Sequence, residues 1–333
     1  MANKLISQMG LPRSIANIFA ARNITTAKVL SLMEQRLQNE HLAGHLSTCL
    51  KGLDEALFGG IPFGVLTELV GPAGIGKTQF CLKLSLLAAL PPSYGGLGGR
   101  VIYIDVESKF SSRRMIEIGM RSFPDVFHKK DMAQEMAGRI LVLRPASLSE
   151  FTESLQKIKV SLLEQEVKLV IIDSMAALIT GEYEQGAPIQ NSLGWHISFI
   201  KSIAEFARIP IVVTNQVRSR NRNEVSHYSF QELSSSGAQG CSPGYDSHLV
   251  AALGVHWAHS VTIRLVLEAK SGQRFIKLAK SPMSPPLAFP FIITSSGISL
   301  LSDSGKELSG TEINEIHCQA YSDIISNHWE NQQ

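Results

Sequence analysis

The sequence lacks the features that mark a secreted, disulfide-bonded or zinc-binding protein. Its four cysteines lie far apart and include no Cys-x-x-Cys pair, so neither a disulfide framework nor a zinc site is predicted. No apolar run reaches the roughly 20 residues of a membrane span, and the opening MANKLISQMG has no hydrophobic signal segment. We therefore expect a soluble protein of a reducing, intracellular compartment, without membrane contact.

The chain also has little excess charge of either sign. Its 31 Lys and Arg residues nearly balance 29 Asp and Glu residues, and the formal net charge is +2. A nucleic-acid-binding protein often shows a strongly basic balance, because phosphate neutralisation needs cations. Any contact with DNA must therefore come from a local arrangement of basic residues.

What is present is a regular alternation of short apolar runs and helix-like patterns. Strands are expected at 65–70, 101–104, 140–143, 168–172 and 209–213, and helices at 77–90, 112–121, 149–163 and 190–207. Apolar strands that alternate with helices indicate a parallel sheet with helices on both faces. Strand-like runs within 260–280 and 289–301 predict antiparallel hairpins that extend this sheet. The predicted fold class is α/β.

The strongest motif is GPAGIGKT, which fits the phosphate-binding pattern Gly-x4-Gly-Lys-Thr and lies between an expected strand and helix. Its glycines let backbone N–H groups turn toward phosphate oxygens, and the helix that follows adds the positive end of its dipole. The lysine would reach the β- and γ-phosphates, and the threonine would bind Mg²⁺. The predicted nucleotide-binding residues are Gly71, Pro72, Ala73, Gly74, Ile75, Gly76, Lys77 and Thr78.

Polar residues end three of the expected strands, where ligands bind in α/β sheets. Asp173 ends LVIID and can hold the Mg²⁺ shell, while Glu107 follows VIYID and can orient or deprotonate water. Asn215 and Gln216 follow IVVT, where an amide can respond to the γ-phosphate. For each of these residues, simple capping of a strand or helix end is the competing interpretation, and Asp105 fits that role.

A stretch of about thirty residues after Gln216 has no periodicity and is rich in Ser, Asn, Arg and Gly. Arg218, Arg220 and Arg222 stand at alternate positions, and two aromatic residues follow, which suits phosphate contact and base stacking. Three acidic residues in the same stretch offset the arginines. We therefore expect weak DNA binding and no direct strand exchange.

These motifs, in this order, resemble the RecA-type strand-exchange recombinases of eukaryotes and archaea. The resemblance covers 46–301 and is strongest in LSTCLKGLDEALFGGIPFGVLTELVGPAGIGKTQFC at 46–81. PPSYGGLGGRVIYIDVESKFSSRR and AKSPMSPPLAFPF are most similar to the B-type paralogues of that family. The resemblance implies a RecA-like ATPase core that uses ATP and Mg²⁺. It also implies hydrolysis by Glu107, Lys77 and Gln216, Mg²⁺ binding by Asp173 with Thr78, and stacking of Arg114 on adenine.

For the whole protein, the resemblance implies a nuclear, DNA-dependent ATPase with slow turnover that acts in homologous-recombination repair of double-strand breaks. Its expected partners are a C-type paralogue, further paralogues, and single-stranded or branched DNA. An assembly subunit that binds ATP but hydrolyses little of it is the alternative. A hexameric helicase is disfavoured by the proline-containing cap segment, and a GTPase by the lack of an Asn-Lys-x-Asp motif.

The sequence departs from the filament-forming members of that family in three places. The expected organisation is a shortened N-terminal helical segment at 1–34, a linker at 35–45, a RecA-like core at 46–302 and a polar tail at 303–333. The linker has no Phe-x-x-Ala segment, which those members use to dock into a neighbouring subunit. Lys280 replaces an acidic residue in the cap, where it could reach ATP bound between subunits or simply face solvent.

Overall fold

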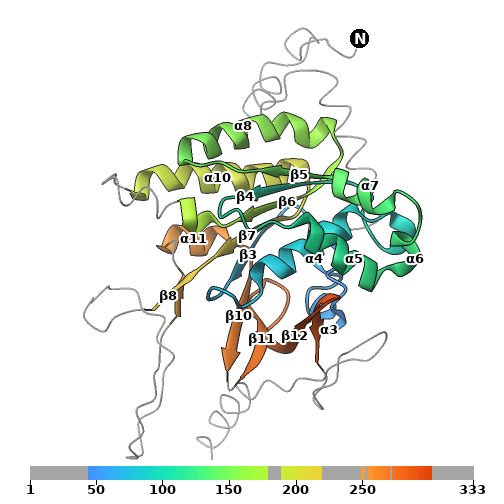
Figure 1. Ribbon diagram of the computed structural model, residues 1–333. Coiled ribbons are helices and arrows are strands. Elements are labelled where there is room, and N and C mark those ends of the chain that lie inside the picture. The colour runs from blue at the N-terminus through green and yellow to red at the C-terminus, as the bar shows by residue number, and fades with distance from the viewer. Residues whose placement is uncertain (1–43, 179–188, 220–248, 252–253, 271, 302–333) are drawn as a thin grey trace, which may run out of the picture.

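The computed structural model describes residues 44–178, 189–219, 249–251, 254–270 and 272–301 (Figure 1). Its strands are β1 (His45–Leu46), β2 (Ile61–Pro62), β3 (Leu66–Val70), β4 (Arg100–Asp105), β5 (Ile140–Leu143), β6 (Val167–Asp173), β7 (Ile211–Asn215), β8 (Val217–Ser219), β9 (Leu249–Ala251), β10 (Ile263–Lys270), β11 (Gln273–Lys280), β12 (Leu287–Thr294) and β13 (Gly297–Leu300). Its helices are α3 (Lys51–Ala56), α4 (Lys77–Ala89), the short 3-10 helix η2 (Pro92–Tyr94), α5 (Ser112–Ser122), α6 (Pro124–Phe127), α7 (Met132–Gly138), α8 (Leu148–Glu164), α10 (Ile189–Ala207) and α11 (Gly254–Ser260).

One large sheet organises the described part of the chain. Its nine strands lie in the order β13-β12-β11-β10-β3-β7-β6-β4-β5. The pairs from β10 to β5 are parallel, and the pairs from β10 to β13 are antiparallel. This arrangement confirms the predicted α/β class with antiparallel strands added at the C-terminal side.

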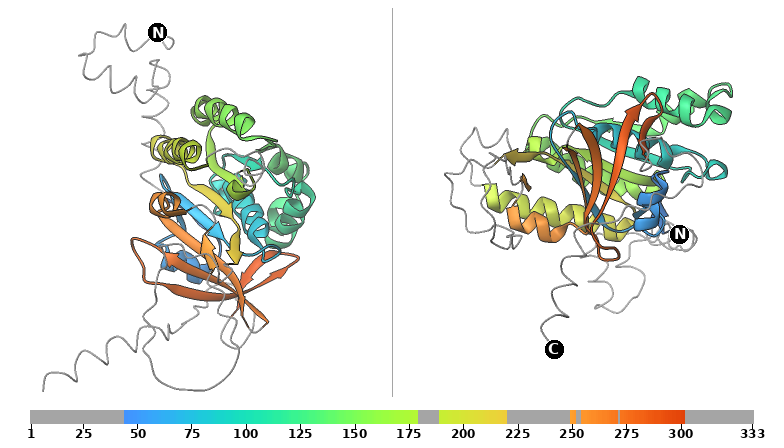
Figure 2. Two further views of the ribbon diagram at one scale, coloured as in Figure 1. Left: turned by 90° about the vertical axis from the view of Figure 1, so that its left-hand side faces the viewer. Right: turned by 90° about the horizontal axis from the view of Figure 1, so that it is seen from below.

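The central strands are apolar along their whole length because both faces of the sheet are covered. In β4, Val101 and Tyr103 belong to one apolar cluster, whereas Ile102 and Ile104 belong to a second. The first cluster includes residues of α3 to α7, and the second includes residues of α8, α10 and α11. Figures 1 and 2 show these two groups of helices on opposite sides of the sheet. Alternate residues of each strand therefore face different helical layers.

Most predicted elements appear within two residues of the expected ends, and the shifts have local causes. The strand expected at 209–213 is β7 at Ile211–Asn215. It starts later because the Ile209 N–H donates to the Ala204 carbonyl at 3.3 Å and so closes the preceding helix. Helix α11 at Gly254–Ser260 lies where the sequence predicted no helix. Seven residues are too few to display a helical period, so sequence periodicity could not reveal this helix.

A buried carboxylate holds α11 to the sheet. Glu68 of β3 is fully buried and accepts hydrogen bonds from Trp257 Nε1 at 2.6 Å and Asn215 Nδ2 at 2.7 Å. Its other oxygen forms an ion pair with Arg264 Nε of β10 at 2.6 Å. One charged side chain thus joins three strands and a helix, and it is stabilised because both of its oxygens have donors.

The expected segments at 1–34 and 303–333, and nearly all of the linker at 35–45, lie outside the described residues, so the domain boundaries stay predictions. Among the described residues, the structure contains no helix that is both long and apolar enough to cross a membrane.

Candidate active site

The sheet order brings the predicted site residues to one edge. Strands β3, β7, β6 and β4 are successive parallel neighbours, so their carboxyl ends face the same way. The phosphate-binding loop follows β3, Gln216 follows β7, Asp173 ends β6, and Glu107 follows β4. Residues that are up to 145 positions apart in the chain, 71 to 216, therefore meet at one site.

The loop after β3 is built for a close backbone approach. Helix α4 starts at Lys77, and no side chain caps its first turn. Gly76 has a φ of 124°, which side chains with a Cβ rarely adopt, and a Cβ on Gly71 would lie 2.4 Å from the Leu267 carbonyl oxygen. The Lys77 ammonium donates to the carbonyls of Gly71 at 2.6 Å and Pro72 at 2.9 Å. The loop fits an anion at the positive end of the helix dipole.

Asp173 is the centre of a buried cluster of oxygen atoms. Its Oδ2 accepts from Thr78 Oγ1 at 2.9 Å and from Tyr103 Oη at 2.7 Å, and its Oδ1 accepts from Thr214 Oγ1 at 2.5 Å. Carboxylate and hydroxyl oxygens suit a hard cation such as Mg²⁺. The structure thus brings the predicted pair Thr78 and Asp173 together in a donor set that fits the metal of a bound nucleotide.

Glu107 is held by three partners from different elements. Its Oε1 accepts from Ser174 Oγ at 2.7 Å and from Gln216 Nε2 at 3.3 Å. Its Oε2 forms a close ion pair with the Lys109 ammonium. Burial raises the pKa of Glu107, but the hydrogen bonds from Lys109 and Ser174, the charge of Lys109 and the Gln216 hydrogen bond outweigh burial and leave the pKa lowered. The carboxyl group is therefore ionised, as a proton acceptor must be.

Burial also affects the loop lysine. Desolvation lowers the pKa of Lys77, while the negative charge of Asp173 acts in the opposite direction. A nearby second cation, Lys109, lowers this pKa further. Lys77 consequently lies where an added negative charge, such as a phosphate oxygen, would be stabilised.

Four residues of this site were missed by the sequence reasoning. Ser174 and Thr214 directly adjoin predicted residues in the quoted segments LVIIDS and IVVTNQV, and Lys109 follows Glu107 by two positions. Tyr103 is an apolar-looking member of a buried strand. The first three could have been predicted, because they lie next to predicted site residues in the sequence. Tyr103 could not, because only the packing of β4 against β6 shows that its hydroxyl faces Asp173.

Two of the polar residues at strand ends, Asp105 and Asn215, support the fold. Asp105 is fully buried, and its carboxylate accepts from the Lys109 and Phe110 backbone N–H groups at 2.8 and 3.1 Å. It therefore fixes the turn after β4, as predicted. Asn215 is fully buried and donates to Glu68, so its amide belongs to the network below α11 rather than to the phosphate side.

For the other predicted residues, the structure gives a position at most and does not test the predicted contact with adenine or DNA. The Arg114 guanidinium donates to Gln79 Oε1 at 2.9 Å and to carbonyls of the turn between β12 and β13, so it lies beside α4. Its stacking on adenine stays a prediction. Arg218 lies in β8, which pairs with β9, and Arg220 and Arg222 lie outside the described residues.

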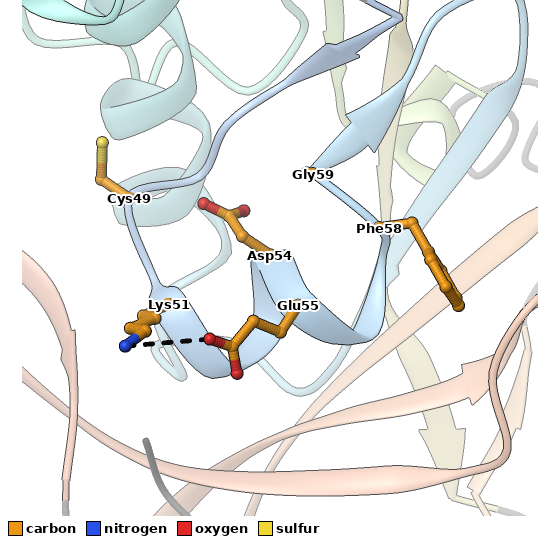
Figure 3. Close-up of a pocket in the computed structure, with 6 residues that line it drawn as sticks. All are labelled: Cys49, Lys51, Asp54, Glu55, Phe58 and Gly59. Atoms are coloured by element: carbon orange, nitrogen blue, oxygen red, sulfur yellow. Dashed lines mark ion pairs between the residues drawn. The ribbon is translucent and has the colours of Figure 1, made fainter. Parts of the chain in front are cut away.

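A separate concave surface beside α3 shares none of these residues (Figure 3). Its lining includes the ion pair between Lys51 and Glu55 at 3.9 Å and the largely exposed Phe58. Its other carboxylate, Asp54, accepts hydrogen bonds from Ser47 and Thr48. Since these contacts hold the chain ahead of α3, we assign this surface no chemistry.

A phosphate-binding loop after β3, a carboxylate at the end of a neighbouring strand and a mixed nine-stranded sheet define a RecA-like nucleotide-binding core. The sequence model of the Rad51 family matches residues 40–301. The chain belongs to the Rad51 family.

Comparison with named relatives indicates which members of the Rad51 family this chain is similar to. A "DNA repair protein RAD51 homolog 2" from Arabidopsis thaliana is 62% identical over 366 aligned positions, which cover 98% of this chain and 99% of the relative. The protein of the same name from Homo sapiens is 35% identical, with 81% of this chain and 72% of the relative covered. A "DNA repair protein RAD51 homolog 3" from Cricetulus griseus is 28% identical, covering 86% and 75%. The predicted similarity to the B-type paralogues is confirmed.

Proposed function

We propose that this protein is an ATP hydrolase that acts in DNA repair by homologous recombination. The proposal rests on one observation: two groups of residues with different chemical roles lie together at one edge of the sheet. Lys77, Thr78 and Asp173 form the phosphate and Mg²⁺ side, and Glu107 with Gln216 forms the water side. All five residues were predicted from the sequence alone.

In the proposed mechanism, the backbone N–H groups of the loop and the Lys77 ammonium bind the phosphates of ATP. Thr78 and Asp173 would hold Mg²⁺, and the metal would supply positive charge for the phosphate oxygens. Glu107 accepts the proton of the attacking water, and Ser174 and Gln216 keep its carboxylate in one orientation. Because Gln216 donates to Glu107 and also begins the segment that leads into β8, its position can depend on both the nucleotide and that segment.

The biological setting follows from the relatives, which are named as DNA repair proteins. We infer that the protein acts in the nucleus and assists the strand-exchange recombinase within a complex of paralogues that includes the C-type paralogue. Its DNA partner is single-stranded or branched DNA, contacted through Arg218, Arg220 and Arg222.

A second candidate is a subunit in which bound ATP stabilises a complex with a partner and is hardly hydrolysed. The ion pair between Lys109 and Glu107 favours this function, because a paired carboxylate is a weaker proton acceptor. The two candidate functions differ in the residues that they need. Hydrolysis needs both Glu107 and Lys77, whereas the assembly function needs only Lys77.

Turnover of ATP, measured with and without single-stranded DNA and with and without the C-type partner, distinguishes them. Under the hydrolase proposal, Glu107→Gln abolishes DNA-stimulated turnover while ATP still binds. Lys77→Ala abolishes both the stimulated turnover and the binding of ATP. Glu153→Gln serves as the matched control, because this exposed glutamate of α8 pairs only with Lys157 among the ion pairs of the described residues and belongs to no predicted site. If partner binding needs Lys77 but not Glu107, and no stimulated turnover exists, the assembly function holds instead.

The DNA contact has its own test. Replacing Arg218, Arg220 and Arg222 together with alanine should reduce the slope of log K against log salt by about one per lost phosphate contact. An unchanged slope would show that these arginines do not contact phosphates.

A further inference from the structure

The turn after β4 presents a lysine to the site at a defined position. The buried Asp105 accepts hydrogen bonds from the backbone N–H groups of Lys109 and Phe110. The Phe110 ring packs on Tyr103, with ring centroids 4.8 Å apart. Both interactions hold the turn in place, so the fold sets the position from which the Lys109 side chain extends.

The Lys109 side chain reaches the carboxylate two residues earlier. Its ammonium pairs with Glu107 Oε2, the oxygen opposite the one that binds Ser174 and Gln216. The Lys109 side chain is 47% exposed, whereas that of Glu107 is only 18% exposed. The lysine can therefore change partners, while the carboxylate cannot easily leave the site.

This pair differs from the surface ion pairs of the same protein. Lys157 and Glu153, for example, lie on one helix face at 3.6 Å with exposed fractions of 79% and 63%. Such pairs contribute little because water screens them. The pair at Glu107 is more strongly coupled, because the carboxylate is largely shielded and has two further donors.

We propose that Lys109 is a positioning residue of this site, which holds the Glu107 carboxylate in an ion pair and thereby restrains it from accepting a proton from water. The inference rests on the proposed ATP hydrolase function. Lys77, from the phosphate loop, is the other cation near this carboxylate, and the charges of Glu107 and Lys109 act in opposite directions on the pKa of Lys77. The other two partners, Ser174 after β6 and Gln216 after β7, are uncharged. Lys109 is thus the cation whose loss should most change the basicity of Glu107.

The first test does not depend on hydrolysis. In protein labelled with ¹³C at the glutamate side-chain carboxyl, the Glu107 resonance is identified by its disappearance in Glu107→Gln. Its pKa should rise by about one pH unit or more in Lys109→Met, because an opposite charge at contact favours the ionised form. Lys109→Arg, which keeps the cation, should leave the pKa low. An unchanged pKa in Lys109→Met would overturn the proposal.

The second test measures the restraint on the reaction. For a general base whose pKa rises by about one unit, turnover should increase by about threefold in Lys109→Met, and the acid limb of the kcat profile should move to higher pH. Lys109→Arg should keep both as in the unmodified protein. In a Glu107→Gln background, Lys109→Met should have no further effect. A raised pKa with unchanged or lower turnover would show that Lys109 does not restrain the base.

If the unmodified protein shows no ATP turnover under any condition, the proposed hydrolase function is wrong, and the carboxyl titration still decides whether Lys109 holds Glu107. If turnover is present and depends on Glu107 but the titration shows no effect of Lys109, only the present inference is wrong.

Discussion

Asp173 shows, at the scale of single residues, how the oxygen atoms of a buried carboxylate are supplied with hydrogen-bond donors. Three hydroxyl groups from three elements donate to it, and one of them, Tyr103, is itself fully buried. Burial, together with nearby negative groups that include Asp173, raises the pKa of Tyr103 well above its usual value. The phenol therefore stays a donor to the carboxylate at all ordinary pH values.

We expect Tyr103→Phe to lower the free energy of unfolding by about 2 kcal/mol, because it removes a buried hydrogen bond to a charged group. Urea unfolding monitored by circular dichroism measures the change. Tyr94→Phe is the matched control, since its hydroxyl accepts from Lys129 near the surface, and its effect should stay within about 0.5 kcal/mol. Equal losses in both variants would contradict the importance of the Asp173 contact.

At the scale of elements, Lys280 belongs to the attachment of α11. Its ammonium donates to the carbonyls of Ala258 at 2.9 Å and Val261 at 2.6 Å, at the C-terminal end of that helix. Burial lowers the pKa of Lys280. The lysine therefore does not simply face solvent, and its contact with ATP bound between subunits stays a prediction. It caps a helix whose last carbonyls lack intrahelical donors.

Lys280→Met should therefore reduce the free energy of unfolding by about 1–2 kcal/mol through the lost carbonyl contacts, without changing ATP turnover of the complex with the C-type partner. Lys277→Met on the same strand removes a more exposed ion pair with Glu268 and should cost less than about 1 kcal/mol. A large loss of turnover with unchanged stability would instead support the hypothesis that Lys280 reaches ATP between subunits.

At the scale of the whole molecule, stability depends on two apolar layers, one on each face of the sheet. Cys81 of α4 lies fully buried in the layer that also contains Leu69 and Ile171. Burial raises the pKa of its thiol well above the usual 9.0. The folded protein therefore keeps this proton at a pH where the unfolded chain releases it.

The contribution of Cys81 is fully present below the unfolded pKa and is lost as pH rises beyond it. Between pH 8 and pH 10 the loss from this group should be about 1 kcal/mol. Urea unfolding of the unmodified protein and of Cys81→Ala measures it, and the variant should lose less over the same interval. Parallel pH profiles for the two proteins would show that this thiol is not responsible.

The sequence by itself determined the fold class and predicted the residues that meet at the candidate site. Strands such as β4 and β6 are apolar on both faces, which only a sheet covered by two layers of helices can accommodate, so their pattern sufficed. GPAGIGKT, Asp173, Glu107 and Gln216 were found because each directly follows or ends such a strand. Each of these residues can be recognised from its own short segment of sequence. Parallel pairing then places the carboxyl ends of these strands at one edge of the sheet.

Only the tertiary structure decided which polar groups meet. The contacts of Asp173 with Tyr103, of Glu107 with Lys109, and of Glu68 with Trp257 depend on strand order and on side-chain directions. The capping of α11 by Lys280 likewise requires strand β11 to lie beside the end of a short helix. Hydrophobic periodicity specifies which face of an element is buried, but it carries no information on the partner of a single polar atom. That choice is made when the layers pack.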